Sequence, residues 1–454
     1  METAVQAGGT AAQSAEMVPE ASVTQPDPSP WNLPFRILFR FVFCYFMLYG
    51  SESGRVNLMD AIPGVSKVGQ FIVKGWHILV PWVAIHVFHL SGRAVTYFPT
   101  GSGDTTLAYV ENLCYLVIAL AATLAWSVAD RKRKDYRKLH GWLRILIRYT
   151  LALTMFGYGF AKVFPLQFRF PGLAKLVEPF GDFSPMGVLW NFMGASPAYT
   201  IFSGAVEVLG GALLLFRRTT TLGAMVCAGA LLNIAMLNFC YDVPVKLYST
   251  NLLLMAILLL APDLGRLMNV LVLNRPAPAA DLGNLPLRYR WMRLAAVGVK
   301  CLFIGSVLYF QITGGWRSYK QVRNPERPPL FGLYEVEAFA QNGRELPPLV
   351  TDANRWRKVM VQFPGFFTVK AMDDSQRSYT SEYGKGSDTL TLFVNGDKTK
   401  RNEFKYSRPD ADHVALEGTL AGDVLSLKMR RIDTSRFLLL NRGFHWINEM
   451  PFNR

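Results

Sequence analysis

The sequence predicts a multi-pass α-helical membrane bundle followed by an all-β domain, either a barrel or a sandwich. Two observations carry this prediction. Long apolar runs recur up to residue 313 of a 454-residue chain that is 51% hydrophobic, and such runs are typical of membrane-spanning helices. After residue 330 the apolar period changes from about 3.6 to about two, which indicates β-strands.

Composition sets the expected domain boundaries. Residues 1–30 are rich in Ala, Ser, Thr and Pro and poor in large apolar residues, so we expect them to be disordered. Residues 31–140 form a first membrane half with two spans and an interfacial helix, and residues 141–313 form a membrane core with the last span. A polar linker over 314–330 then leads to a β-rich domain over 331–454.

The apolar runs predict seven membrane spans. The segment 71–90 is also apolar, but it contains three histidines, a lysine and a proline, so we expect it to lie at the membrane interface. If it crossed instead, the chain would have eight spans. The seven predicted spans cover residues 33–50, 106–128, 141–163, 197–216, 220–240, 245–263 and 290–313.

The distribution of charge predicts an orientation. The chain has 48 Lys and Arg against 33 Asp and Glu, a net charge of +15. Because the basic clusters flank apolar helices, they suit membrane lipids as partners and argue against nucleic acid. Seven spans with a cytoplasmic N-terminus place 131–134 and 217–218 inside. We therefore expect a multi-pass protein of the cell inner membrane with an extracytoplasmic C-terminal domain.

An internal repeat divides the helical part. Three matches share one spacing of 108 residues, which predicts two equivalent halves. On this repeat Glu111 corresponds to Glu207 with a shift in the connecting loop, although a helix start also favours an interfacial carboxylate. The matched pairs are 36–41 with 144–149, Pro63-Gly64 with Pro171-Gly172, and Trp82 with Trp190.

Two charged residues interrupt the apolar runs and are our candidate catalytic residues. Glu207 lies about ten residues into the run 198–216, where a carboxylate needs a partner or a proton. Lys162 ends the preceding predicted span, so its ammonium group either snorkels to the surface or forms a buried pair with an acid. Gly204 and Gly211 share one helical face, which predicts close approach of a neighbouring helix.

Further polar residues lie where lipid should exclude them, and we predict that they form a polar membrane cluster. Asn233 and Asn238 are five residues apart, so they do not share a helical face. Asp242 and Lys246 flank a Val-Pro-Val turn, where they form either a local ion pair or a catalytic pair. The predicted cluster comprises Tyr158, Asn233, Asn238, Asp242 and Lys246.

The remaining chemistry-bearing residues predict no metal site. His77, His86 and His89 lie on one aromatic segment without a nearby carboxylate, which is more typical of hydrogen-bonded surface groups than of metal ligands. Asp104 follows a glycine turn and is expected to cap the next helix. All five cysteines lie in or beside apolar segments, which indicates small core residues rather than disulfides.

Eight short candidate strands favour an up-and-down barrel of lipocalin size over a sandwich. Trp356 and Tyr379 either line a ligand cavity or plug the barrel. The aromatic segment 442–449 is expected to close the barrel or to dock on the membrane domain. The candidate strands cover 333–340, 358–363, 367–372, 389–394, 403–406, 414–418, 424–430 and 437–440.

The stretch from 140 to 262 resembles the DoxX family of small bacterial membrane proteins. The resemblance covers about a quarter of the chain and rests on the segments 159–162 (GFAK), 205–211 (AVEVLGG), 216–219 (FRRT) and 238–246 (NFCYDVPVK). It implies a four-helix membrane bundle. Some members are associated with quinone-linked oxidation of sulfur compounds or with redox defence, so a quinone is the candidate cofactor that the resemblance implies.

Three functions remain open from the sequence. The first is a quinone-linked or redox-accessory component of the cell envelope. The second is a membrane enzyme acting on a lipid-like substrate with Lys162 or Glu207 as its base, which resembles in plan the vitamin K-dependent carboxylase-like proteins. The third is a non-catalytic assembly or binding protein whose barrel recognises an envelope protein.

Overall fold

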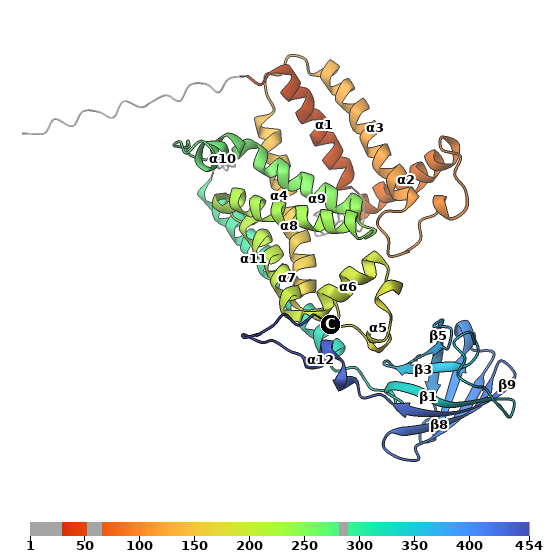
Figure 1. Ribbon diagram of the computed structural model, residues 1–454. Helices are drawn as coiled ribbons and strands as arrows, with labels where there is room; N and C mark the ends of the chain where they lie inside the picture. The colour runs from red at the N-terminus through yellow and green to blue at the C-terminus, as the bar shows by residue number, and fades with distance from the viewer. Residues whose placement is uncertain (1–29, 52–65, 281–288, 454) are drawn as a thin grey trace, which may run out of the picture.

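The computed structural model describes residues 30–51, 66–280 and 289–453. The chain forms an elongated helical body with a β-barrel at the end opposite α10 (Figure 1). The expected disorder of residues 1–30 falls, except for Pro30, outside the described residues, as does the Pro63-Gly64 part of the repeat.

Helix starts follow local capping chemistry. The side chain of Asn32 accepts a hydrogen bond from the backbone N–H of Phe35 and so caps the helix that begins at Leu33. Ser196 caps the helix that begins at Pro197 in the same way. The α-helices of this body are α1 (Leu33–Tyr49), α2 (Ser66–His86), α3 (Thr106–Ala129), α4 (Arg137–Val163), α5 (Leu173–Leu176), α6 (Pro185–Ala195), α7 (Pro197–Leu214), α8 (Thr220–Cys240), α9 (Lys246–Leu260), α10 (Leu264–Leu271) and α11 (Arg290–Arg323).

Five helical segments in the described part of the chain are long and apolar enough to cross a membrane. Two other expected spans do not reach this standard: α1 has 17 residues, and α4 carries Arg144, Arg148 and Lys162. The predicted count of seven is therefore not confirmed. The five segments are Thr106–Ala129, Pro197–Leu214, Arg217–Cys240, Lys246–Leu271 and Arg290–Arg323.

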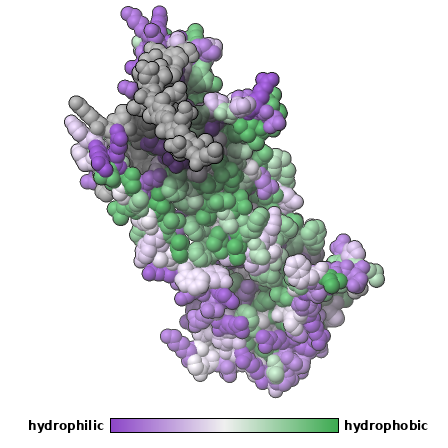
Figure 2. Space-filling model, turned by 90° about the vertical axis from the view of Figure 1, so that its left-hand side faces the viewer, coloured by the Kyte–Doolittle hydropathy of each residue, from purple (hydrophilic) through white to green (hydrophobic). Residues whose placement is uncertain are grey.

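The surface agrees with a membrane protein. On the face that Figure 2 shows, hydrophobic residues form a band between two hydrophilic ends. Large apolar side chains such as Leu120, Phe202 and Leu302 are exposed on the candidate spans, as expected where lipid rather than water is the solvent.

One apolar core joins the helices. It buries side chains from α1, α3, α4, α8 and α9. Within it α1 packs along α3, α4 packs along α7, and α8 lies between α7 and α9. The segment expected at the interface, 71–90, forms most of α2, which packs against α3. The short helices α5 and α6 lie between α4 and α7 in the chain.

The C-terminal domain is an eight-stranded barrel, which confirms the barrel and excludes the sandwich. Each strand pairs antiparallel with the next, and β1 closes the barrel by pairing with β9, while the two-residue β2 adds to the edge of β1. The strands are β1 (Gly332–Gln341), β2 (Arg344–Glu345), β3 (Trp356–Val361), β4 (Phe366–Ala371), β5 (Gln376–Tyr383), β6 (Thr389–Phe393), β7 (Asn402–Ser407), β8 (His413–Leu420) and β9 (Asp423–Arg431).

Two strand predictions need correction. β5 is not predicted from the sequence because its residues are mostly polar, and only alternate side chains point into the barrel. The predicted strand 437–440 is instead the start of the short helix α12 (Leu438–Asn441), whose leucines are exposed. In addition, α11 continues to Arg323, into the segment expected to be a linker.

The barrel interior is filled by aliphatic and aromatic residues. Trp356 and Tyr379 are both buried, and the Trp356 ring lies 6.0 Å from those of Phe339 and Phe367 between centroids. Both also line a cavity of about 540 Å³, and their expected role at a ligand site stays a prediction. Trp446 in the segment 442–449 is 91% exposed, and this segment therefore does not close the barrel.

Candidate functional site

A buried lysine–glutamate pair joins α4 to α7. Lys162 Nζ donates hydrogen bonds to both carboxylate oxygens of Glu207, at 2.7 and 2.9 Å. The two side chains are 6% and 2% exposed. Lys162 does not snorkel to the surface, and the buried pair, which the sequence left as one of two alternatives, is present.

Glycines bring the two helix backbones close enough for this pair. A Cβ atom on Gly204 would lie 2.5 Å from the carbonyl oxygen of Gly159 and 2.7 Å from Cβ of Lys162, and one on Gly211 would lie 3.0 Å from the carbonyl oxygen of Ala152. No larger residue fits there without moving the helices. The predicted close approach at Gly204 and Gly211 is confirmed.

The pair is energetically interdependent. Removing two charges from water costs several kcal/mol for each ion, and only close geometry with good hydrogen bonds offsets that cost. Glu207 supplies two acceptor oxygens to one ammonium group, so each charge depends on the other. The pair therefore fixes one positive and one negative charge at a set place in the apolar bundle.

Tyr158 links the pair to a cavity. Lys162 Nζ lies 5.7 Å from the centroid of the Tyr158 ring. Tyr158 precedes Lys162 by one helical turn on α4. Tyr158 lines a cavity of about 740 Å³, whereas Lys162 and Glu207 do not. Tyr158 therefore borders the cavity and also contacts the lysine of the buried pair.

The cavity contains phenol and carboxyl groups from both halves of the helical part. Tyr97 donates a long hydrogen bond of 3.4 Å to Glu111, which is buried near the start of α3. The rings of Tyr158 and Tyr248 lie 6.1 Å apart between centroids, and all four of these residues line the cavity. Glu111 is therefore a buried group beside the cavity and not a solvated interfacial carboxylate.

Asp104 fixes the turn at one side of this cavity. Its carboxylate accepts hydrogen bonds from the backbone N–H groups of Lys246 and Leu247, at 2.7 and 3.0 Å. It therefore caps α9, whereas Thr105 is the residue that caps α3. The expectation that Asp104 caps the helix after it is wrong, because the chain brings α9 to the same turn.

The predicted polar membrane cluster divides into separate parts. Lys246 Nζ lies 2.8 Å from Asp242 Oδ1 and 3.9 Å from Asp104 Oδ2, which is the local ion pair considered from the sequence. Asn238 is buried, and its side-chain nitrogen has no hydrogen-bond partner among the described residues. Asn233 is exposed on the surface of α8.

Two residues that line the cavity, Tyr97 and Tyr248, are not predicted from the sequence. Tyr97 precedes α3 in an irregular segment and stacks on His77 of α2, with 4.1 Å between ring centroids. Tyr248 follows Lys246 by two residues in α9. Aromatic residues are frequent in this chain, and neither position carried a local signal that separated it from ordinary interface aromatics.

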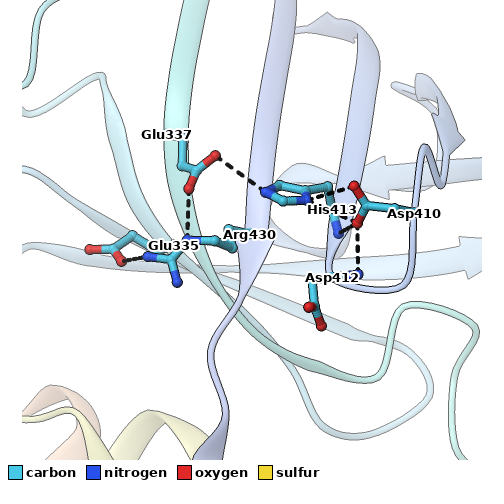
Figure 3. A network of polar contacts seen from close by, with 6 residues as sticks. All are labelled: Glu335, Glu337, Asp410, Asp412, His413 and Arg430. Atoms are coloured by element: carbon cyan, nitrogen blue, oxygen red, sulfur yellow. Dashed lines mark hydrogen bonds and ion pairs between the residues drawn. The ribbon is translucent and has the colours of Figure 1, made fainter.

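The barrel carries a second polar cluster, on its outer surface where β1 meets β9 (Figure 3). Arg430 binds Glu337 at 2.7 Å and Glu335 at 3.0 Å, and His413 lies 2.9 Å from both carboxylate oxygens of Asp410. Backbone and side-chain hydrogen bonds from Asp412 and His413 hold the pKa of the Asp410 carboxyl below its usual range. These contacts join β1, β8 and β9, so we assign them to closing the barrel.

Fold and site together define the class of protein: a helical membrane protein with a buried lysine–glutamate pair and a C-terminal β-barrel. Within this class, the chain belongs to the family of uncharacterized protein YwoB from Bacillus subtilis (strain 168). The two are 32% identical over 149 residues, which is 31% of this chain and 87% of that relative. More than two thirds of this chain therefore lie outside the match.

No protein-family model matches the chain. No solved structure matches it either. The chemistry of the cavity and of the buried pair is therefore what points to a function.

Proposed function

We propose that this protein is a DoxX-like, quinone-linked component of the cell envelope, and that the cavity beside Tyr158 holds the quinone ring. The observation that carries this proposal is the position of Tyr158. Its ring borders the cavity on one side and lies 5.7 Å from the ammonium group of Lys162 on the other. A ligand that contacts Tyr158 in the cavity would therefore contact a side chain that also contacts the Lys162–Glu207 pair.

The lining residues fit a quinone ring. A quinone presents two carbonyl oxygens on an apolar ring, so its site needs hydrogen-bond donors beside apolar surface. The phenol groups of Tyr158 and Tyr248 are such donors, and Phe98 and Leu247 supply apolar surface. The volume of about 740 Å³ falls in the range of about 300–1,000 Å³ that is usual for small-molecule sites.

The protein's own groups would bind the ring and hold a proton near it. A bound quinone carries electrons together with protons between redox partners. In this proposal the Tyr158 hydroxyl donates a hydrogen bond to a ring carbonyl, and Lys162 Nζ keeps a proton behind it with Glu207 as the compensating charge. The electrons come from a separate redox protein, which makes this chain an accessory component.

We further propose seven spans, α1, α3, α4, α7, α8, α9 and α11, in the cell inner membrane. A cytoplasmic N-terminus is supported by the contact of Arg36 with the carbonyl of Arg133 at 2.6 Å, which puts two basic segments at one end. The turn that joins Asp104 to Lys246 lies at the opposite ends of α3 and α9. The barrel is then extracytoplasmic, and the pairing of α1 with α3 and of α4 with α7 supports a repeat of two halves.

A titration with decylubiquinone tests the quinone proposal. The full-length protein in detergent is titrated while its intrinsic fluorescence is followed, and the Tyr158→Phe and Tyr248→Phe variants are compared with it. Loss of a hydrogen bond to the ring should weaken binding by about fivefold to tenfold for at least one variant. Tyr109→Phe is the control, since Tyr109 is exposed on α3 and does not line the cavity.

A different result would favour another function. If the protein does not bind decylubiquinone but binds a phospholipid or isoprenoid that the same variants weaken, the cavity serves the lipid-substrate enzyme considered above. If neither binds, the quinone proposal is overturned.

One specific observation favours the third function, a non-catalytic assembly or binding protein. Phe444, Trp446 and Ile447 near the C-terminus are all exposed, and exposed clusters of large apolar residues mark interaction sites. In-cell crosslinking from the exposed position 450 tests it. A single crosslinked envelope protein that is lost with Trp446→Ser would support this function.

A further inference from the structure

A second cavity, of about 680 Å³, lies at the end of the bundle that holds the arginine-rich turns. It is bordered by the first half of α4, the turn between α7 and α8, and the turn between α9 and α10. Seven lysine and arginine side chains line it. Six of them are Arg137, Lys138, Arg144, Arg148, Arg217 and Arg218, and the seventh is Arg266.

The protein neutralises only part of the positive charge of this cavity: Arg137 lies 3.5 Å from Asp135, and Arg266 is paired with Asp263. Asp263 is the one carboxylate among its lining residues, all of which the structure describes. That carboxylate is already engaged, because Arg266 Nη1 and Thr221 Oγ1 each lie 2.6 Å from one of its oxygens. The remaining basic groups therefore face a cavity whose lining has no second acid.

Arg148 has hydrogen-bonding capacity that the protein does not fully use. Its Nε atom is buried and has no hydrogen-bond partner among the described residues, and its contact with Thr220 Oγ1 is long, at 3.5 Å. An unsatisfied guanidinium N–H group in a buried place costs free energy. Arg148 lines the cavity, and its guanidinium group is only weakly held by the protein. Guanidinium groups bind phosphate with two parallel hydrogen bonds.

The other wall of the cavity is apolar and open to the surface. Trp142, Leu222 and Leu271 line it and are all exposed on the outside of the helical body. A ligand with a negative head and an apolar tail fits both walls at once. Basic pockets between membrane helices on the cytoplasmic side bind anionic headgroups in this way.

We propose that this cavity binds a phosphate group with net negative charge, as carried by the headgroup of an anionic phospholipid. Topology alone does not require this arrangement, because basic residues scattered over cytoplasmic loops satisfy the positive-inside rule. Here basic side chains of three chain segments converge on one cavity. The inference is independent of the quinone proposal, which concerns a different cavity.

Native mass spectrometry of the delipidated full-length protein tests this inference. Three probes are compared: dioleoylphosphatidylglycerol, dioleoylphosphatidylcholine and inorganic phosphate. The anionic lipid should bind at least about tenfold more tightly than the zwitterionic one, and the Arg144→Gln/Arg218→Gln variant should lose that preference. The control is Arg131→Gln/Lys132→Gln, which removes two exposed charges outside the cavity.

Each outcome supports or overturns the proposal, or shows whether the phosphate belongs to a lipid or to a soluble compound. Preference for the anionic lipid without competition by phosphate identifies a headgroup site. Binding of inorganic phosphate that the cavity variant abolishes, without lipid preference, identifies a site for a soluble phosphate compound. The proposal is overturned if the wild-type protein neither prefers the anionic lipid nor binds phosphate, or if the control variant loses as much binding as the cavity variant. The wild-type comparison holds even if the cavity variant fails to fold.

Discussion

Lys162 and Glu207, 45 residues apart in the chain, meet inside the bundle with both carboxylate oxygens on one ammonium group. Because Gly159 and Gly204 let α4 and α7 approach closely, the contact is short and buried. Structure and function both depend on it in our account, since it holds two helices together and keeps a proton beside the cavity.

Breaking one member of the pair should be worse than removing both. Lys162→Met or Glu207→Leu leaves one buried charge without its partner, so each should lower the free energy of unfolding by about 3–5 kcal/mol. The double variant should recover most of that loss. Thermal melting in detergent measures this, and equal melting of single variants and wild type would contradict a buried, interdependent pair.

The role of Glu207 can be separated from its packing. Glu207→Gln keeps an acceptor oxygen for Lys162, so it should stabilise the bundle better than Glu207→Ala. If function is lost equally in both variants while only Glu207→Ala melts early, the carboxylate is needed for proton transfer and not only for a hydrogen bond between helices.

The helix contact itself should fail with one added methyl group. A Cβ on Gly159 would lie 2.9 Å from the carbonyl oxygen of Gly204 and 2.7 Å from Val208, so Gly159→Ala should cost about 1–3 kcal/mol. Gly157→Ala is the matched control two residues away, because its nearest contact is 3.9 Å away at Gln311. Equal melting temperatures for the two variants would show that the backbones are not in close contact.

The proposed orientation puts the barrel outside the cytoplasm. Alkaline phosphatase fused after Arg454 should be active, whereas a fusion after Leu271, which ends α10, should be inactive. Green fluorescent protein at the same positions should give the reverse. A fluorescent and phosphatase-negative fusion at Arg454 would rule out an extracytoplasmic barrel.

The barrel seam should weaken in acid. Hydrogen bonds from Asp412 and His413 keep the pKa of the folded Asp410 carboxyl below its unfolded value, which is about 4. Its contribution to stability is therefore present above about pH 4 and is lost as the pH falls through the lower, folded pKa.

Hydrogen–deuterium exchange of β8 and β9 in the full-length protein, corrected for intrinsic rates, measures this loss. Exchange should rise below about pH 4 in the wild type and show a smaller rise in Asp410→Asn. Asp412→Asn is the control, because the Asp412 carboxylate makes none of the contacts drawn in Figure 3. A wild-type pH profile in Asp410→Asn would contradict the assignment.

The parts of the fold that sequence predicts well are those with a strong local or energetic signal. A lysine and a glutamate inside apolar runs each require a partner, and small residues on one face of the same helix predict where that partner's helix lies. Seven of the eight predicted strands have a counterpart in the barrel, and in β7 and β9 the side chains alternate between buried and exposed.

The parts that could not be predicted depend on contacts without a local signal. Asp104 caps a helix 142 residues further along the chain, and nothing near it in the sequence marks α9 as the partner. Asn233 and Asn238 look alike as amides in an apolar run, yet one faces outward and the other inward. The run 437–440 is apolar enough for a strand, but the barrel is already closed by β9.

The most direct test of the central claim is the content of the protein as purified. The full-length protein is isolated in mild detergent, its ultraviolet spectrum is recorded, and its organic extract is analysed by mass spectrometry for quinones. We expect close to one quinone per chain in the wild type and far less in Tyr158→Phe. A wild-type extract free of quinone, from membranes that contain it, would contradict a quinone-linked function for this cavity.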